Sequence, residues 1–262
     1  MCLTCGCGDE EGVRVTLLDV PGHGHAHGHA HDHDHPHLHP DVETLLLEER
    51  VLVKNDDLAE HNRTWLAARE SVAVNVMSSP GAGKTSLLER TVRDLRDRGE
   101  WGEVCVVEGD QETTFDAERI SRAGARAVQV NTGAGCHLDA DMVRRALESL
   151  EPAAGSLVFV ENVGNLVCPA LFDLGERSKA VVISVTEGDD KPLKYPHMFA
   201  TADVVVVNKT DLLPYVDFDV DRLAAQARSL NPGLEVIPLS VRTGEHVDAW
   251  YGWLERTRQA VD

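Results

Sequence analysis

Residues 78–85 carry the clearest chemical signal in the chain and read Ser-Ser-Pro-Gly-Ala-Gly-Lys-Thr. A G-x-x-x-x-G-K-[ST] pattern between a strand and a helix binds phosphates, because its glycines let backbone N–H groups surround an anion and the helix N-terminus adds positive charge. Ser78 stands where the first glycine of that pattern usually is. We expect Lys84 to reach the β- and γ-phosphates and the Thr85 hydroxyl to ligate Mg²⁺. The predicted phosphate-binding residues are Gly81, Ala82, Gly83, Lys84, Thr85 and Ser86.

A second pattern, N-K-x-D, is formed by Asn208, Lys209 and Asp211 directly after the valine run at 204–207. The aspartate of such a motif accepts hydrogen bonds from the N1 imino and N2 amino groups of guanine, which adenine cannot reproduce. Ser240 and Val241 begin a Ser-Val-Arg triplet at the place where GTPases carry a Ser-Ala-Lys/Arg loop against the base. The bound nucleotide is therefore predicted to be GTP or GDP.

Two acidic residues, Asp110 and Glu161, follow predicted strands at the sheet edge where α/β proteins bind ligands. We expect Asp110 to support Mg²⁺ or orient a water. Asp116 fits that role less well, because its position suits a helix N-cap. Glu161 precedes Gly164 by three residues, the spacing of the GTPase D-x-x-G element, whose glycine N–H senses the γ-phosphate. Lys84, Asp110 and Glu161 are thus the predicted catalytic residues.

Three further residues have the chemistry of metal ligands. Cys136 and His137 are adjacent in a glycine-rich loop, and Cys168 lies four residues beyond Gly164. A lone Cys or His is usually a packed core residue, whereas an adjacent pair after glycines is a better ligand candidate. Any metal held by all three would respond to the nucleotide state if the loop ending at Cys168 moves with the γ-phosphate.

The N-terminus places three thiols within six residues, at Cys2, Cys5 and Cys7. Their C-x-x-C-x-C spacing allows them to wrap one soft or borderline ion, with the α-amine of Met1 as a fourth donor. Zn²⁺, or Ni²⁺ in a square-planar N/S geometry, fits this donor set. A redox pair or a disordered cap is the alternative interpretation.

Nine of the thirteen histidines alternate with small or acidic residues over positions 23–39. No apolar face accompanies the alternation, so a disordered tract is expected rather than a strand. A flexible string of imidazoles binds several Ni²⁺, Zn²⁺ or Cu²⁺ ions with modest selectivity, and the alternative is a merely polar tail. The histidines of this predicted metal reservoir are His23, His25, His27, His29, His31, His33, His35, His37 and His39.

The elements that must position these motifs alternate between strands and helices. Apolar runs at 72–77, 103–108, 125–130, 157–160, 180–185, 204–207 and 235–239 predict strands, and periodic segments at 86–98, 139–150, 219–230 and from 245 predict helices. The expected fold is an α/β P-loop NTPase with a mostly parallel doubly wound sheet over residues 71–262. Residues 41–70 are predicted to be helical, with Asp56 or Asp57 capping a second helix after Asn55, and residues 1–40 to form the metal-binding tail.

The composition of the chain limits the partners and the cellular location that we expect. The 262 residues are 42% hydrophobic, enough for a buried core, and their net charge of −19 argues against nucleic acid as a bulk partner. No apolar run is long enough to span a bilayer and no signal peptide is apparent, so we expect a cytoplasmic location without a membrane partner. The six cysteines are then expected to be metal ligands or reduced thiols rather than disulfides.

Taken together, the motifs resemble the HypB family of hydrogenase nickel-incorporation GTPases, which belongs to the SIMIBI class. The matching segments are the N-terminal cysteines, the histidine run, and residues 78–85, 108–111, 131–139, 161–169 and 208–211. The resemblance implies a homodimer that forms with GTP, a high-affinity N-terminal metal site, and a second site of Cys136, His137 and Cys168 at the dimer interface. It also implies a HypA-type metallochaperone and a hydrogenase large-subunit precursor as partners, and combined delivery and storage of nickel.

Three other functions fit parts of the sequence. A urease-type nickel-insertion GTPase also carries a histidine run, but its metal signature is Cys-Pro-His, whereas here Cys136-His137 and Cys168-Pro169 are separate. A nickel or zinc storage protein with a regulatory nucleotide domain is a second alternative. A small-molecule or nucleoside kinase is disfavoured, because no lid-like arginine cluster accompanies the phosphate loop and N-K-x-D would be unexplained.

Overall fold

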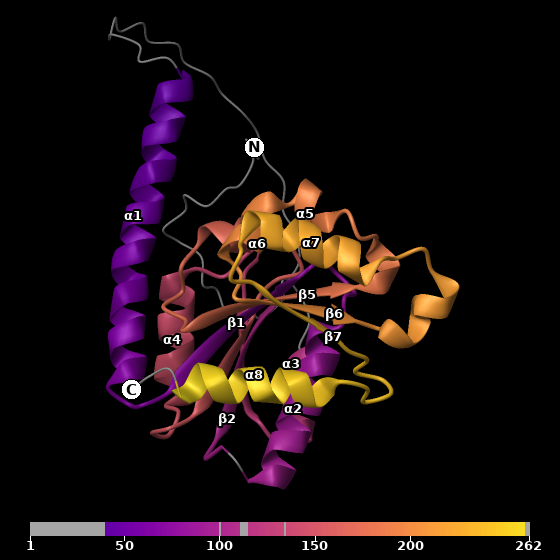
Figure 1. Cartoon of the computed structure of the whole chain (residues 1–262). Helices are drawn as coiled ribbons and strands as arrows, with labels where there is room; N and C mark the ends of the chain where they lie inside the picture. The colour runs from indigo at the N-terminus through magenta and orange to yellow at the C-terminus, as the bar shows by residue number, and fades with distance from the viewer. Residues whose placement is uncertain (1–39, 100, 111–114, 134, 260–262) are drawn as a thin grey trace, which may run out of the picture.

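The computed structural model describes residues 40–99, 101–110, 115–133 and 135–259 (Figure 1). The predicted N-terminal ligands Cys2, Cys5 and Cys7 and the histidines of 23–39 lie outside the described residues. Within the described part, a central sheet is covered by helices on both faces.

Seven parallel strands form one sheet in the order β3-β2-β4-β1-β5-β6-β7. Their bounds are β1 Val72–Ser78, β2 Val104–Asp110, β3 Arg126–Asn131, β4 Leu157–Glu161, β5 Ser178–Ser184, β6 Val204–Asn208 and β7 Glu235–Pro238. All seven predicted strands are present, with ends shifted by at most two residues. The prediction of a P-loop α/β fold with a parallel doubly wound sheet is confirmed.

Helices cover the two sheet faces in separate groups. One face carries α2 Lys84–Arg98, α3 Phe115–Ala123 and α8 Val247–Gln259, and the other carries α4 Ala140–Leu150, α6 Pro196–Thr201 and α7 Val220–Leu230 (Figure 1). The shorter elements are α5 Lys191–Lys194 and the 3₁₀ turns η1 Cys168–Leu171, η2 Val185–Glu187 and η3 Thr210–Tyr215.

The side chains of β1 alternate between these two faces, as a strand buried on both sides requires. Val72, Val74 and Val76 pack with the α2 and α8 side, while Ala73 and Met77 pack on the opposite face. Asn75 is fully buried on that second face and is the only polar residue of β1 before Ser78. The strand that leads into the phosphate loop is therefore held at the centre of the sheet from both sides.

A long helix, α1 Pro40–Ala67, precedes the sheet and packs along α4 (Figure 1). Its buried residues Asn55, Ala59, Asn62 and Leu66 are spaced by four, three and four positions, which places them on one stripe of the helix. The sequence left open whether this segment packs on the nucleotide domain or on a second subunit. The described contacts are with the domain of the same chain.

The predicted break after Asn55 is wrong, since α1 is one continuous helix. Asn55 does not compete for the helix backbone but bonds to other elements. Its Nδ2 donates to the Asp173 carbonyl at 2.7 Å, and its Oδ1 accepts from the Ala140 N–H at 2.9 Å. Because these tertiary partners satisfy the amide, the helix continues past the expected cap.

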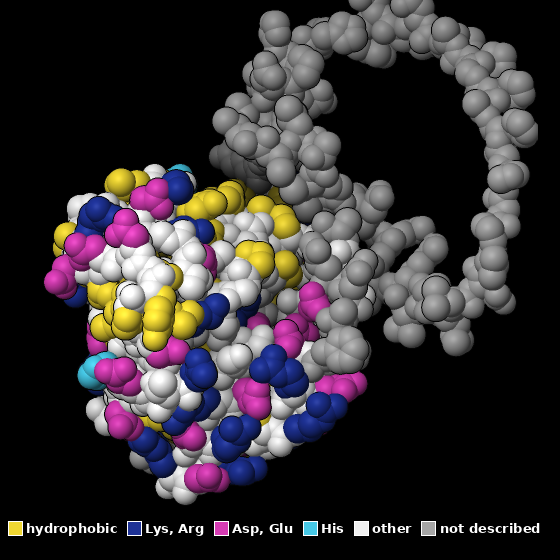
Figure 2. All heavy atoms as spheres, turned by 90° about the vertical axis from the view of Figure 1, so that its right-hand side faces the viewer, with side chains coloured by type: hydrophobic (Ala, Val, Ile, Leu, Met, Phe, Trp, Pro, Cys, Tyr) yellow, Lys and Arg dark blue, Asp and Glu magenta, His cyan; other side chains and the backbone are white. Residues whose placement is uncertain are grey.

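Charges of both signs are interspersed on the face of the molecule shown in Figure 2, and hydrophobic side chains gather there in several patches. Among the residues that the structure describes, no helix combines the length and the apolar character that crossing a membrane demands.

Replacing Asn55 by alanine should lower the free energy of unfolding by about 1–2 kcal/mol, because the Ala140 N–H at the start of α4 would lose its partner. Urea denaturation followed by circular dichroism measures the change. The neighbouring exposed Lys54, changed to alanine, is the matched control and should stay within about 0.5 kcal/mol of the parent. Equal effects of the two changes would contradict the assigned role of Asn55.

Candidate nucleotide and metal sites

The phosphate loop turns between β1 and α2. Gly83 caps the helix with φ 101°, and a Cβ atom there would lie 2.5 Å from Asn208 Nδ2, so both conformation and space require glycine. Lys84 begins α2 and its Nζ donates to Ser78 Oγ at 2.9 Å. Serine at the usual first-glycine position therefore has a structural function, which is to hold the lysine across the loop.

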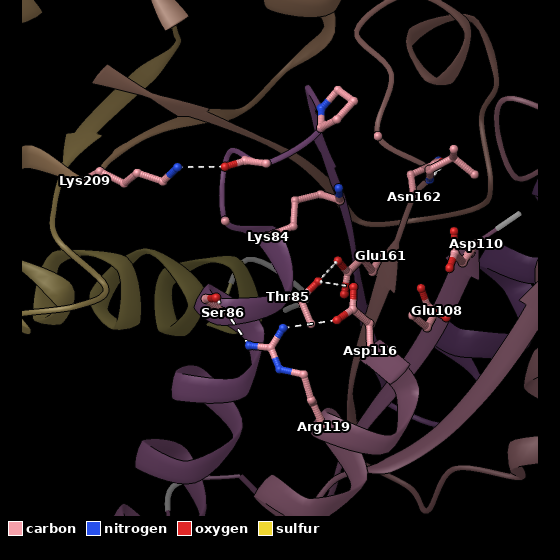
Figure 3. A pocket seen from close by; sticks show the side chains of 16 residues that line it. Lys84, Thr85, Ser86, Glu108, Asp110, Asp116, Arg119, Glu161, Asn162 and Lys209 are labelled. Atoms are coloured by element: carbon pink, nitrogen blue, oxygen red, sulfur yellow. Dashed lines mark hydrogen bonds and ion pairs between the residues drawn. The ribbon is translucent and has the colours of Figure 1, made fainter. Parts of the chain in front are cut away.

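Carboxylates gather beside Thr85 at the ends of β2 and β4 (Figure 3). The Thr85 hydroxyl lies 2.7 Å from Glu161 Oε1 and 3.1 Å from Asp116 Oδ2. Glu108 and Asp110 line the same cavity of about 580 Å³, together with the phosphate loop. This volume is in the range of small-molecule sites, and one end of it is strongly acidic.

Burial raises the pKa of two carboxyl groups in this cluster, those of Glu108 and Glu161. Glu108 is 3% exposed, and its burial, followed by repulsion from Glu161 and Asp110, raises its pKa to about 8. Burial also raises the pKa of Glu161, although the Lys84 charge opposes that shift. One oxygen of each residue, Glu108 Oε2 and Glu161 Oε2, is buried without a protein hydrogen-bond partner. Such unpaired carboxylate oxygens beside a threonine hydroxyl fit a hard divalent cation such as Mg²⁺.

Arg119 of α3 fixes the position of Asp116. Its guanidinium donates to Asp116 Oδ1 at 3.1 Å and to Glu89 Oε2 at 2.9 Å, and it also reaches Ser86 Oγ at 3.4 Å (Figure 3). The arginine thus ties α3 to the first turns of α2. Asp116, which the sequence ranked below Asp110, contacts Thr85 directly as a result.

Asn208 joins the phosphate loop to the loops predicted to hold the base. Its Nδ2 donates to the Ala82 carbonyl at 3.0 Å, while its Oδ1 accepts from the N–H groups of Lys209 at 2.7 Å and Val241 at 3.2 Å. Lys209 has a left-handed backbone, φ 64°, and its Nζ bonds to the Gly81 carbonyl at 2.8 Å. One buried amide therefore connects all three nucleotide-binding segments.

The remaining base-binding candidates lie together next to Asn208. Ser240 Oγ donates to Asp211 Oδ1 at 2.6 Å, and Arg242 reaches the other carboxylate oxygen at 3.7 Å. The Asp211 side chain is 15% exposed, so it remains accessible. Of the predicted base-binding residues, Lys209 lines the cavity, whereas Asn208, Asp211, Ser240 and Val241 do not. Asn208 links their loops to the phosphate loop through its bond to the Ala82 carbonyl.

A second cluster lies in the loops that follow β3 and β4. The ligand atoms of Cys136, His137 and Cys168 lie within 4.8 Å of one another, with Cys136 Sγ 2.8 Å from Cys168 Sγ and 3.7 Å from His137 Nδ1. His137 stacks on Phe172, ring centroids 3.9 Å apart, and its burial lowers its pKa, which favours the neutral ligating form. Two thiols and a neutral imidazole suit Ni²⁺ or Zn²⁺.

The two sites share one segment, residues 161–168. Glu161 at its start bonds to Thr85, and Cys168 at its end belongs to the metal cluster. Between them, Gly164 lies against the phosphate loop, where a Cβ atom would come within 3.2 Å of the Pro80 Cα. Asn165 Nδ2 donates to the Cys136 carbonyl at 3.4 Å.

Most of the residues predicted from the sequence are therefore brought together within the described chain. Sequence reasoning undervalued Asp116 and did not single out the cavity-lining acid Glu108, nor Arg119. An acidic residue directly after the apolar run 104–107 was the available signal for Glu108, and the three-residue spacing to Asp116 was the signal for Arg119. No local pattern indicates that Glu187 accepts a hydrogen bond from Ser79 of the phosphate loop.

The parallel sheet, the phosphate loop and the N-K-x-D loop joined to it define a P-loop NTPase of the GTP-binding class. The family model described as "CobW/HypB/UreG, nucleotide-binding domain" matches residues 72–238. The chain belongs to this family, and within it to the HypB hydrogenase maturation factors, since several of these are more than 50% identical to it.

Among the relatives, hydrogenase maturation factor HypB of Rhizobium leguminosarum bv. viciae is 56% identical over 209 residues, covering 80% of this chain and 69% of its own length. HypB of Escherichia coli K12 is 53% identical over 216 residues, 82% of this chain and 73% of that protein. HypB of Helicobacter pylori, solved in complex with nickel, has a TM-score of 0.73 at 36% identity and covers 79% of this chain and 96% of that one. HypB of Archaeoglobus fulgidus has a TM-score of 0.72 at 39% identity, covering 80% and 100%.

The raised pKa of Glu108 predicts a pH-dependent stability. Between its ordinary value of 4.5 and about 8, the folded protein keeps a proton that the unfolded chain releases, so the nucleotide-free protein should lose stability as pH rises through this window. Glu108→Gln should remove about 1–3 kcal/mol of that loss, measured by urea denaturation from pH 5 to pH 8 without Mg²⁺. Glu148→Gln, at an exposed position, should leave the slope unchanged. An unaltered slope in Glu108→Gln would contradict the assignment.

Proposed function

We propose that the protein is a GTP-hydrolysing nickel metallochaperone that delivers and stores nickel for the maturation of [NiFe]-hydrogenase. The observation that carries this proposal is the shared segment 161–168, which begins at the Thr85-bonded Glu161 and ends at the metal-cluster residue Cys168. Because the two sites share one short segment, a change of nucleotide state can change the geometry of the metal site. The named function of the relatives and the nickel-bound H. pylori HypB support nickel and hydrogenase as the biological context.

The nucleotide site is arranged for phosphoryl transfer to water. Lys84, held across the loop by Ser78, is placed to contact the β- and γ-phosphates, and Asp110 and Glu161 would stand on the side where the attacking water is oriented. Mg²⁺, held by Thr85 with the acidic cluster around it, would supply charge neutralisation of the phosphates. Gly164, pressed against Pro80, is placed to respond to the γ-phosphate.

Nickel is the cargo of the second site in this proposal, with Cys136, His137 and Cys168 as its ligands. Zn²⁺ fits the same donors and is the competing ion. Storage would fall to the nine histidines of 23–39, and high-affinity capture to Cys2, Cys5 and Cys7, all outside the described residues.

The partners that belong to this function are a second copy of the chain, a HypA-type metallochaperone and a hydrogenase large-subunit precursor. Support for GTP-dependent dimerisation at the metal site comes from Val167 and Leu171, which flank Cys168 and are 54% and 52% exposed. Apolar side chains exposed beside ligands are suited to burial against another copy.

Guanine selection by Asp211 predicts that Asp211→Asn weakens GDP binding by at least about tenfold, because asparagine cannot accept two hydrogen bonds from the N1 and N2 groups. Xanthosine diphosphate, which has a carbonyl at C2, should bind the variant better than it binds the parent. Fluorescence titration with labelled nucleotides measures both affinities. The exposed Asp217, changed to asparagine, serves as the control; unchanged GDP binding in Asp211→Asn would place guanine selection elsewhere.

Nickel titration tests the metal site directly in the full-length chain carrying Cys2, Cys5 and Cys7→Ser. Thiolate-to-nickel charge-transfer absorption should appear and should vanish in Cys136→Ser and Cys168→Ser, because these residues supply the thiolates. The matched control is Cys105→Ala, a cysteine buried in β2 away from the cluster, which should keep the absorption. The apparent Ni²⁺ affinity should differ between the protein bound to GDP and the protein bound to a non-hydrolysable GTP analogue. Equal affinities would show that the two sites are not coupled.

A further inference from the structure

A buried polar chain runs along one face of the sheet, from the segment before β5 over β1 to the end of β4, and neither site accounts for it. It starts at Asn75, in the otherwise apolar part of β1, which is 0% exposed. The other members are Asn162, 1% exposed at the end of β4, and Glu176, 7% exposed before β5. Burying three polar side chains at the centre of a domain is unfavourable unless their hydrogen bonds are made.

Every hydrogen bond of this chain is donated toward Glu176. Glu176 Oε2 accepts from the Leu174 N–H at 2.7 Å, and Glu176 Oε1 accepts from Asn75 Nδ2 at 3.2 Å. Asn75 Oδ1 accepts from Asn162 Nδ2 at 3.4 Å, and Asn162 Oδ1 accepts from the Leu138 N–H at 3.0 Å. We call this chain, Glu176–Asn75–Asn162, the amide relay.

Its direction is set by its two ends. The backbone N–H groups of Leu174 and Leu138 can only donate, so each end of the relay must present an acceptor. Glu176 meets this demand because both carboxylate oxygens accept. Burial raises the pKa of Glu176, and the charge of Lys179, whose Nζ lies 3.6 Å from Oε1 in an ion pair, opposes that shift. Each asparagine then has one allowed amide orientation. A flip of either amide would set two donors or two acceptors against each other.

The relay ends at the metal-binding loop. Leu138 directly follows His137, so the bond from its N–H to Asn162 fixes the backbone that carries Cys136 and His137. Asn162 also directly follows Glu161, lines the nucleotide cavity and accepts from the Val163 N–H at 3.0 Å (Figure 3). One side chain thus attaches the metal-binding loop to the strand end that bonds to the phosphate loop.

We propose that Asn162 is a positioning residue that transmits the nucleotide state to the Cys136–His137 loop. Glu176, acting through Asn75, holds the Asn162 amide in the orientation in which its Oδ1 accepts from the Leu138 N–H. This inference rests on the proposed function, since it needs a metal at Cys136 and Cys168. A displacement of residues 161–164 by the nucleotide moves Asn162 and, through one hydrogen bond, the backbone of two ligands. Coupling then needs no larger rearrangement of the sheet.

The fixed direction makes the inference testable by reversal. Glu176→Gln puts an amide where two donors arrive, and the mismatch passes along the relay to Leu138. Asn162→Asp sets an acceptor against Asn75 Oδ1. With both changes the relay reverses and its hydrogen bonds can form again: the amide at 176 donates to Asn75, Asn75 donates to the carboxylate at 162, and that carboxylate accepts from the Leu138 N–H. The ion pair between Lys179 and residue 176 is lost in both variants that carry Glu176→Gln.

Each single variant should bind Ni²⁺ about tenfold more weakly than its parent, because a buried donor or acceptor is left unpaired. The ratio of the Ni²⁺ affinities measured with GDP and with a non-hydrolysable GTP analogue should approach one. The double variant should regain Ni²⁺ affinity to within about threefold of the parent and recover most of the ratio. The measurement is the nickel charge-transfer titration in the full-length chain with Cys2, Cys5 and Cys7→Ser.

Asn62→Asp is the matched control. Asn62 is 2% exposed and donates to the Ala140 and Leu174 carbonyls, so it touches the same two segments without joining the relay. Loss of stability in this variant should not be rescued by Glu176→Gln. Thermal unfolding and GDP binding, measured on every variant, separate a folding defect from a change in coupling.

Two results would overturn the relay alone. In the first, the parent shows the nickel absorption and its nucleotide dependence, and both single variants match the parent. In the second, the loss of Ni²⁺ affinity in the double variant is the sum of the losses in the single variants. Absence of the absorption in the parent would instead overturn the proposed function, and the relay with it. The three patterns are distinct, because the parent decides the proposed function, and the single and double variants decide the relay.

Discussion

The carboxylate of Glu161 imposes the main electrostatic constraint on this structure. It is buried at the end of a central strand, beside Glu108 and Asp116, with Lys84 as the opposing charge. Such a cluster is unfavourable in the absence of a cation, and the protein tolerates it because the surrounding sheet is tightly packed on both faces. The acids that repel one another here are the groups whose negative charge a bound divalent cation would offset. Ligand binding and folding stability are therefore linked at this position.

Buried asparagines form hydrogen bonds between segments that are distant in the chain. Asn208 connects the phosphate loop to the base-binding loops, Asn55 and Asn62 attach α1 to the start of α4, and Asn75 and Asn162 link β1 to the end of β4. An amide donates and accepts from one planar group, so it can satisfy two segments at once without adding charge. Aliphatic packing could hold the same segments together, but it would not specify their relative orientation.

Much of the fold and of both sites could be predicted because the informative patterns are local. The strand runs, the phosphate loop at 78–85 and the N-K-x-D loop each depend on residues close in sequence, and the resemblance brought Cys136, His137 and Cys168 together. The rest depends on tertiary partners. Asn55 looked like a helix break because its partners, Asp173 and Ala140, are distant in the chain. Asp116 suited a cap, and only the packing of α3 against α2 brings it to Thr85.

The position of β1 in the sheet has a consequence for biosynthesis. Its hydrogen-bonding neighbours β4 and β5 are both encoded much later, and the loop that braces the glycines comes from the end of β6. A nascent chain emerging from the ribosome has its phosphate loop early, but the hydrogen bond from Asn208 to that loop can form only after β6 has been translated. Such non-local pairing slows folding and leaves β1 exposed in the meantime. The segment with the N-terminal cysteines and histidines is thus synthesised well before the nucleotide site is complete.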